Sequence, residues 1–210
     1  RDRFSEVNLF LSASETHNKR NINKTTEEPV ATYKGVLDEA RAAGLRVRGY
    51  LSTCFGCPFE GAVAPSKVSE VAARLYELGV YEVAISDTIG IAHPGQVPEV
   101  VGAVADLVPL SHIALHFHDT RGTALVNVLA GLQSGVTTFD ASAGGLGGCP
   151  YAPGAAGNLA TEDLLYMFDG LGIETGVRLG AVMEASRALE PMLGHPLPSR
   201  VVQATKLTKK

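Results

Sequence analysis

The sequence contains little cysteine, no tryptophan and no long apolar run. It has 3 Cys and 0 Trp among 210 residues. So few cysteines, odd in number and with no signal-peptide pattern before them, argue against a disulfide-stabilised secreted scaffold. The longest apolar stretches are far shorter than the ~20 residues that a membrane-spanning helix needs. We therefore expect a soluble protein of a reducing compartment, with no membrane partner.

Charge and composition exclude further classes of protein. The chain has 18 Lys and Arg against 22 Asp and Glu, a formal net charge of −4. This balance argues against a broad nucleic-acid surface, so we expect no nucleic-acid partner. Hydrophobic residues make up 45% and charged residues 19% of the chain, which is the composition of a folded domain with a buried core. The length suggests one domain, or one and a half.

Apolar runs and amphipathic stretches alternate along the chain. Strands are predicted at residues 7–12, 47–52, 81–86, 113–118 and 136–141. The first run is nearly continuous, as in a parallel strand that is buried on both faces. A polar loop is predicted from Glu15 to Lys24, and Thr25 and Glu28 then have the spacing of a capping box that opens a helix. Helices are also predicted after each of the later strands.

This alternation, repeated every ~25–40 residues, predicts βαβ units and a parallel sheet. A (β/α)8 TIM barrel has eight strands and ~250 residues. Five strands are predicted here, so we interpret the chain as a barrel that lacks about its first three β/α units. An open, doubly wound sheet is the alternative. Residues 1–176 would form barrel units four to eight with the active-site face, and residues 177–210 a C-terminal helical segment and tail.

Two histidines lie at the carboxyl end of the fourth predicted strand. His116 and His118 are separated by Phe117, so their side chains project to one face while Phe117 projects to the other. Two imidazoles ~7 Å apart along a strand suit a shared metal ion. In a barrel the carboxyl ends of the strands carry the catalytic groups. The alternative is a pair of polar residues at a strand end, and the motif alone favours neither.

A glycine-rich segment with one cysteine follows the fifth predicted strand. Six glycines lie between Gly144 and Gly157, and Cys149 lies among them. We interpret the segment as a mobile loop whose backbone can approach a ligand closely. A lone cysteine is usually a small buried hydrophobe, but the position of Cys149 at the expected active face favours a reactive thiol.

Two further motifs are less specific. Asp87 and Thr88 follow the third predicted strand, where they could position a substrate; a turn in which Asp87 caps backbone amides explains Asp87 equally well. Cys54 and Cys57 form a C-x-x-C pair. No second pair completes a zinc site, and Pro58 keeps the segment out of a redox helix.

Taken together, these motifs resemble those of the hydroxymethylglutaryl-CoA lyases, a family in the DRE-TIM metallolyase superfamily of metal-dependent barrels. The resemblance is carried by NIN at 21–23, GCPFEG at 56–61, SDTIG at 86–90, HFHDT at 116–120, GLGGCPYA at 145–152 and GNLATED at 157–163. Related condensing synthases, which make isopropylmalate or homocitrate, share the His-x-His motif and the later Asn but lack the cysteine loop. The resemblance implies a (β/α)8 barrel that this chain enters at the fourth strand.

The resemblance also implies a metal site. His116, His118 and Asn158 would be ligands of a divalent metal, Mg²⁺ or Mn²⁺, which suits a mixed nitrogen and oxygen donor set. The family's Asp-Arg-Glu motif on strand one supplies a further ligand Asp and an Arg that stabilises an enolate, and it has no counterpart in these residues.

For the chemistry, the resemblance implies cleavage of 3-hydroxy-3-methylglutaryl-CoA to acetyl-CoA and acetoacetate, as in leucine catabolism and ketone-body formation. Cys149 would take part in proton transfer, His116 would exchange a proton with the substrate hydroxyl, and Asp87 with Thr88 would contact the substrate. The alternatives are a condensing synthase of the isopropylmalate or homocitrate type, or an inactive barrel fragment. We further expect an acyl-CoA substrate, a homodimer at full length, and a bacterial cytoplasmic location, or a mitochondrial one in a eukaryote.

Overall fold

The computed structural model describes residues 4–148 and 157–207. Within them, one parallel sheet has the strand order β1–β2–β3–β4–β5. The strands are β1 (Glu6–Ser12), β2 (Arg46–Ser52), β3 (Glu82–Asp87), β4 (Ile113–Phe117) and β5 (Thr138–Asp140). The helices are α1 (Glu15–Ile22), α2 (Pro29–Ala42), α3 (Pro65–Glu77), α4 (Gln96–Ala105), α5 (Ala124–Gln133), α6 (Thr161–Gly170), α7 (Leu179–Leu193) and α8 (Arg200–Leu207), with 3₁₀ turns at Leu110–His112 and Ala143–Gly145.

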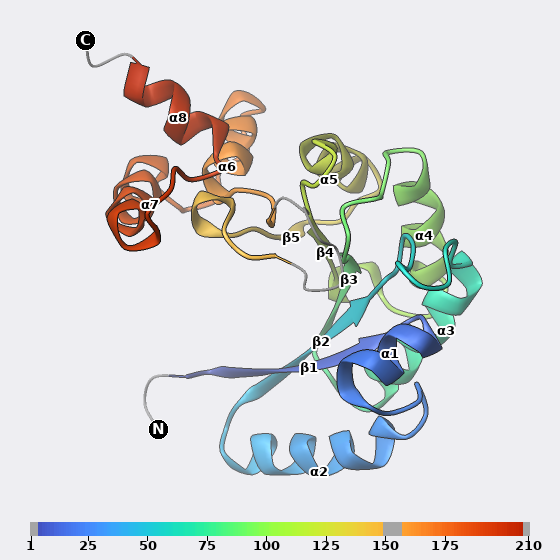
Figure 1. Cartoon of the computed structure of the whole chain (residues 1–210). Helices are drawn as coiled ribbons and strands as arrows, with labels where there is room; N and C mark the ends of the chain where they lie inside the picture. The colour runs from blue at the N-terminus through green and yellow to red at the C-terminus, as the bar shows by residue number, and fades with distance from the viewer. Residues whose placement is uncertain (1–3, 149–156, 208–210) are drawn as a thin grey trace.

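The strand order decides between the two predicted architectures. Each strand pairs with the next one along the chain, and α2, α3, α4 and α5 lie along the outside of the curved sheet (Figure 1). In a doubly wound sheet the strand order reverses at a switch point, and helices cover both faces. Sequential parallel strands with helices on one face are consecutive units of a barrel. The predicted α/β barrel segment is therefore confirmed, and the open sheet is wrong.

The two faces of the sheet differ sharply in chemistry. Odd-numbered strand residues face the helices and form the core, and Val83, Ile85 and Leu115 are fully buried there. The packing is close, because a Cβ added at Gly49 would lie 3.4 Å from Leu75 of α3. Even-numbered residues face the concave side, which would be the interior of a complete barrel. Polar and charged side chains gather on this side, among them Arg48.

The sequence predicted that the first strand is buried on both faces, but in the structure only one face of β1 is buried. Leu9 and Leu11 are buried under the helices, whereas Asn8 and Phe10 are exposed, Phe10 by 50%. The reason is that β1 is an edge strand whose even-numbered residues face the open concave side. Burial along the whole strand is found in β3, at the centre of the sheet.

The predicted polar loop after β1 is instead a helix, α1. Ser14 caps its first turn, with Oγ accepting a hydrogen bond from the backbone N–H of His17 at 3.1 Å. Asn23 ends the helix in the left-handed region, at φ 56°. The helix is polar on every side, so no apolar period marked it in the sequence. Its signals were the cap Ser14 and the basic residues Lys19 and Arg20 in the last turn.

The predicted capping box is present. The Thr25 N–H donates to Glu28 Oε2 at 2.6 Å, and the Glu28 N–H donates to Thr25 Oγ1 at 3.2 Å. The two reciprocal bonds close the turn that leads into α2, which begins at Pro29. The N-cap of α2 is Glu28 and not Thr25, so the box lies one turn before the helix that it was predicted to open.

The C-terminal helices pack on α6, beyond β5 (Figure 1). The buried carboxylate of Glu162 accepts hydrogen bonds from the Gly144 N–H and the Ser186 hydroxyl, which joins α6 to the turn after β5 and to α7. The neighbouring Asp163 accepts from Ser199 Oγ at 2.7 Å and from the Val201 N–H at 2.9 Å, and so caps α8. The expected tail therefore includes a helix. A domain boundary at residue 176 stays a prediction.

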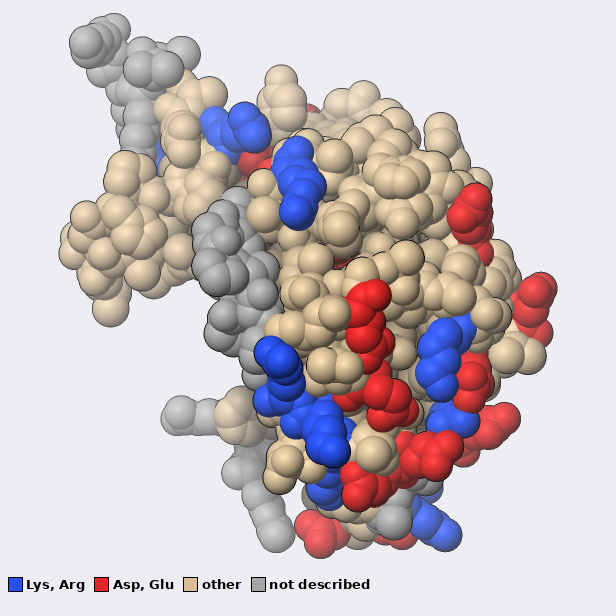
Figure 2. Space-filling view, turned by 45° about the vertical axis from the view of Figure 1, so that its right-hand side comes forward, with Lys and Arg blue, Asp and Glu red and all other residues tan. Residues whose placement is uncertain are grey.

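The surface carries charges of both signs. Figure 2 shows Lys and Arg interspersed with Asp and Glu over the lower part of one face, while its upper part is mostly uncharged. Among the described residues, no helix has the length and apolar character needed to cross a membrane.

Among residues 4–148 and 157–207, no further strand pairs with the outer edges of β1 and β5. We predict that these 210 residues expressed alone self-associate and lack activity. Unpaired strand edges and exposed apolar side chains such as Phe10 favour pairing with another copy. Light scattering after size exclusion should show oligomers. A monodisperse monomer that melts in one two-state transition would contradict the prediction.

Candidate active site

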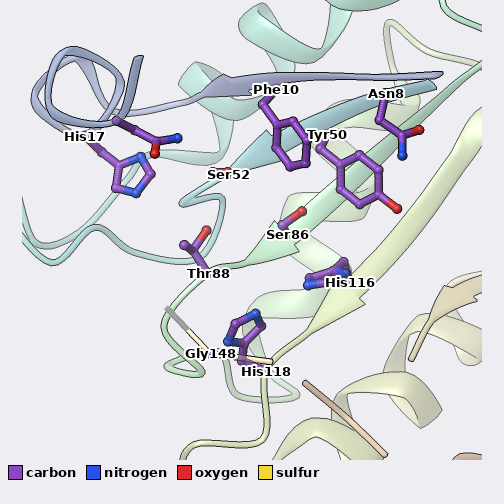
Figure 3. A pocket seen from close by; sticks show the side chains of 11 residues that line it. Asn8, Phe10, His17, Tyr50, Ser52, Ser86, Thr88, His116, His118 and Gly148 are labelled. Carbon is purple, nitrogen blue, oxygen red and sulfur yellow. The ribbon is translucent and has the colours of Figure 1, made fainter. Parts of the chain in front are cut away.

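A pocket of about 400 Å³ lies on the concave side of the sheet, toward the carboxyl ends of the strands. Residues of β1, β2, β3 and β4, of α1 and of the glycine-rich segment line it. Figure 3 shows Phe10, Tyr50, Ser86 and His116 projecting from neighbouring strands toward this space, with His118 just beyond the end of β4.

The two histidines share the pocket, as their spacing predicted. His116 and His118 both line it, and their ring centroids are 5.4 Å apart. Phe117 between them is 1% exposed and packs in the core against Phe55, with ring centroids 5.6 Å apart. The alternation along β4 therefore brings two imidazoles to one side of the sheet.

Asn158 lies beside His118, although 40 positions separate them in the sequence. An isolated antiparallel bridge joins the two residues, and the Asn158 side-chain N–H donates to the Leu146 carbonyl at 2.9 Å. Asn158 Oδ1 and His118 Nδ1 are buried and have no hydrogen-bond partner among the described residues. Buried polar atoms without partners are rare in proteins and indicate a missing ligand, ion or water.

These atoms fit a divalent cation in part. Within the described segments, no three His, Cys, Asp or Glu side chains are grouped as a metal site. Two imidazoles and one amide oxygen are available from His116, His118 and Asn158. This mixed donor set suits an ion that keeps open coordination positions, with a further ligand supplied from elsewhere.

The environment of His118 keeps its ring uncharged. Burial, and then the neighbouring His116, lower the pKa of His118 to about 4. At pH 7 the imidazole is therefore neutral, which is the form that binds a cation through a ring nitrogen.

A buried ion network beside His116 was not predicted from the sequence. Arg48 donates from Nε to Glu82 at 2.6 Å and from Nη1 to Asp140 Oδ1 at 2.8 Å. Nη1 also donates to the Tyr50 hydroxyl at 2.5 Å, and Asp140 Oδ2 lies 3.3 Å from His116 Nδ1. Burial alone would lower the pKa of Arg48, but the adjacent Asp140 carboxylate outweighs it and raises that pKa.

The network escaped prediction because its members are far apart in the chain. Arg48 and Asp140 are 92 positions apart and meet only when the sheet forms. The one signal in the sequence was a charged residue at an even-numbered position of each strand concerned, which apolar periodicity does not detect.

Asp87 is placed differently from the prediction of substrate contact. As an odd-numbered residue of β3 it faces away from the pocket, is 1% exposed, and is not among the pocket-lining residues. Its carboxylate accepts hydrogen bonds from the N–H groups of Ile91 at 2.9 Å and Ala92 at 3.0 Å. Burial raises the pKa of Asp87, although the hydrogen bonds from these two N–H groups act to lower it. The alternative interpretation, a carboxylate that caps backbone amides of the following turn, is the one that the structure supports.

Thr88 does line the pocket, together with Ser52 and Ser86. Its Oγ1 accepts a hydrogen bond from the Thr53 N–H at 2.7 Å, and Thr53 has a left-handed backbone with φ 61°. A β-branched residue rarely adopts this conformation, so the surrounding contacts hold the turn after β2 in place. A role for Thr88 in substrate binding stays a prediction.

The first helix also contributes to the pocket. His17 and Asn21 line it from α1, although the sequence assigned no chemistry to His17. Burial lowers the pKa of His17, with an opposing effect from Glu60. Neither residue could be placed at the site while this segment was predicted as a loop.

The glycines near the site have a packing role as well as a conformational one. A Cβ added at Gly147, which has φ 107°, would lie 2.4 Å from Asn158 Nδ2. One added at Gly157 would lie 2.1 Å from the Gly145 carbonyl oxygen. The described glycines thus let two backbone segments close around Asn158, which corrects the expectation that they serve mobility alone. Cys149 lies outside the described residues, next to the pocket-lining Gly148.

The other two cysteines are buried. Cys54 Sγ donates to the Leu51 carbonyl at 3.0 Å, and burial raises the pKa of this thiol. Cys57 Sγ donates a hydrogen bond to Ser14 Oγ at 3.0 Å. Both thiols therefore hold local backbone and side-chain structure around the turn after β2.

Comparison with known proteins matches residues 3–189 to the HMGL-like family model. The chain is 50% identical over 202 residues to hydroxymethylglutaryl-CoA lyase YngG of Bacillus subtilis, covering 96% of this chain and 68% of that protein. It is 50% identical over 200 residues to the mitochondrial hydroxymethylglutaryl-CoA lyase of Rattus norvegicus, covering 95% and 62%. It is 51% identical over 202 residues to a cytoplasmic 3-hydroxy-3-methylglutaryl-CoA lyase of Danio rerio, covering 96% and 60%.

Solved structures agree. A hydroxymethylglutaryl-CoA lyase from Pseudomonas aeruginosa superposes with a TM-score of 0.94 at 44% identity, covering 97% of this chain and 68% of that one. An HMG-CoA lyase from Acenitobacter baumannii, solved in complex with coenzyme A and 3-methylmalate, gives a TM-score of 0.89 at 42% identity, covering 95% and 65%. The chain thus spans about two thirds of the length of these relatives.

We predict that Asp87→Ala lowers the free energy of unfolding by about 1–3 kcal/mol, because the buried N–H of Ala92 and the part-buried N–H of Ile91 lose their acceptor. Asp87→Asn should cost less, since it keeps one acceptor oxygen. Urea denaturation measures both. Unchanged stability together with a loss of catalytic activity would instead indicate direct contact with the substrate.

We also predict that His118 makes stability depend on pH. Its pKa in the folded chain, about 4, lies below the ordinary 6.5, so the unfolded chain binds the proton more readily. Stability that is present above pH 6.5 should be lost as the pH falls toward 4, by about 2 kcal/mol between pH 7 and pH 5. His118→Gln should remove this part of the dependence in urea melts at the two pH values. Equal pH dependence in both proteins would contradict the assignment.

Proposed function

We propose a function from the finding that the chain belongs to the HMGL-like family. The chain would be the larger part of a metal-dependent carbon–carbon lyase, and this lyase would cleave 3-hydroxy-3-methylglutaryl-CoA to acetyl-CoA and acetoacetate. The observation that carries the proposal is that His116 and His118 line one pocket and that Asn158 is bridged to His118. Asn158 Oδ1 and His118 Nδ1 are buried and unpartnered among the described residues. The relatives that share this sequence at about 50% identity are named as lyases of this kind.

His116, His118 and Asn158 would hold the cation, Mg²⁺ or Mn²⁺. When bound, the cation would orient the substrate through its oxygen atoms and make the substrate hydroxyl more acidic. The neutral ring of His118 near pH 7 supports its proposed role as a ligand of the cation. For His116, Asp140 engages Nδ1, so Nε2 is the nitrogen left for the pocket. An exchange of a proton between His116 and the substrate hydroxyl would need this same nitrogen free of the cation, because its single lone pair cannot bind a cation and a proton together.

The reaction transfers one proton overall. A base removes the proton of the C3 hydroxyl, the bond between C2 and C3 breaks as the C3 carbonyl forms, and the electron pair passes to C2. The products are acetoacetate and the enolate of acetyl-CoA, which then takes up a proton at C2. We propose Cys149 as the donor of this proton, because its neighbour Gly148 lines the pocket. Thr88, which lines the pocket, is proposed to hydrogen-bond the substrate, whereas Asp87 caps the backbone of the turn after β3.

The biological setting is likewise a proposal, which the names of the relatives support in part. We infer an acyl-CoA substrate, in line with the coenzyme A complex of the Acenitobacter baumannii lyase, and a role in leucine degradation and ketone-body formation. We infer a homodimer for the full-length protein. Relatives occur in bacteria, in mitochondria and in a cytoplasmic form, and we favour the bacterial cytoplasm, with mitochondria as the alternative in a eukaryote.

We predict that the purified full-length protein forms acetoacetate from 3-hydroxy-3-methylglutaryl-CoA with Mn²⁺, and that chelation by EDTA abolishes the activity until Mn²⁺ is returned.

Cys149→Ser should lower kcat by at least about 100-fold, the usual contribution of a positioned proton donor. Cys57→Ser is the matched control, since this cysteine does not line the pocket, and it should retain activity.

If the protein is instead a condensing synthase, it should form a carbon–carbon bond and not break one. It would release CoA from acetyl-CoA and a 2-oxo acid and would form no acetoacetate. That result would overturn the proposed lyase while leaving the family assignment intact.

A further inference from the structure

The ion network beside His116 carries more negative than positive charge. Arg48 supplies one formal positive charge, and Glu82 and Asp140 supply two negative charges, all three in a largely buried position. Burying an unbalanced charge is costly, so a network that only neutralised Arg48 would need one carboxylate. Of the two carboxylates, Asp140 is the one that lies beside His116.

The sheet register sets the position of Asp140. His116 and Asp140 are direct partners across β4 and β5, so their side chains leave the same row of the same face. Asp140 Oδ2 lies 3.3 Å from His116 Nδ1, while both carboxylate oxygens accept from Arg48 Nη1, at 2.8 Å and 3.1 Å. Arg48 therefore prevents the carboxylate from turning away from the ring.

The other side of the ring is also constrained. Tyr50 meets the His116 ring edge to face, with centroids 6.0 Å apart, and Arg48 donates to the Tyr50 hydroxyl. The side chains of Tyr50 and His116 both line the pocket (Figure 3). The imidazole is thus held by a hydrogen bond at Nδ1 and by a T-shaped contact with the ring of Tyr50.

We propose that Asp140, clamped by Arg48, is the positioning residue that fixes the imidazole of His116 with Nδ1–H toward Asp140 and Nε2 toward the cation of the pocket. A histidine that binds a metal usually donates its other N–H to a carboxylate, which sets the tautomer and the ring orientation. The inference rests on the proposed function only in taking the pocket to bind a divalent cation.

The test is the affinity of the purified full-length protein for Mn²⁺ alone, measured without substrate from the EPR signal of free Mn²⁺. Asp140→Asn, which is nearly isosteric, and Asp140→Ala should each raise the Kd for Mn²⁺ by about 10–100-fold. Glu82→Gln is the matched control, because it also removes one carboxylate partner of Arg48 but does not touch His116. It should change the Kd less than twofold, and circular dichroism melts should show Asp140→Asn as stable as Glu82→Gln.

Two results would overturn the proposal: a Kd for Asp140→Asn within twofold of wild type, or an equal loss of affinity in Glu82→Gln. A second measurement needs no variant at Asp140. ¹⁵N NMR of histidine-labelled, metal-free wild type should show His116 as the Nδ1–H tautomer, and an Nε2–H tautomer would also overturn it. Weak Mn²⁺ binding by Asp140→Asn in a protein that forms no acetoacetate would support the positioning role and refute the lyase.

Discussion

Side chains alternate between the two faces of a β-strand, and in this sheet the odd-numbered residues of every strand face the helices while the even-numbered residues face the concave side. The register keeps this alternation in step from β1 to β5. One face is therefore an apolar core of residues such as Ile85 and Leu115, and the other gathers the charged and hydrogen-bonding groups. The pocket exists because the polar residues of neighbouring strands share that face.

Position within this alternation separates residues that look alike in the sequence. Ser86 and Thr88 reach the pocket, whereas Asp87 between them points to the helix side and caps the turn after β3. His116 and His118 reach the pocket, whereas Phe117 packs in the core. A motif written as a run of adjacent residues thus divides into two sets with different physical roles, one that faces a ligand and one that supports the loop.

The same face concentrates electrostatic effects that act on the histidines. Burial keeps His118 neutral, and the bond between Asp140 and Nδ1 of His116 leaves Nε2 for the pocket. Arg48 links this arrangement to Glu82, so that side chains of four strands, β2 to β5, take part in it. The close approach of the glycine-rich segment, which Gly147 and Gly157 permit, places Asn158 beside His118. Groups from distant parts of the chain therefore act on one small volume.

By itself, the sequence determined the alternating strands and helices, the pairing of His116 and His118 on one face, and the motifs of the family, because these features depend on local periodicity and short spacing. It did not determine that α1 is a helix, since a helix that is polar on every side has no apolar period. Nor did it place Asp87 behind the sheet or Arg48 against Asp140. Those outcomes depend on strand register and on contacts between residues up to 92 positions apart, which only the tertiary structure brings together.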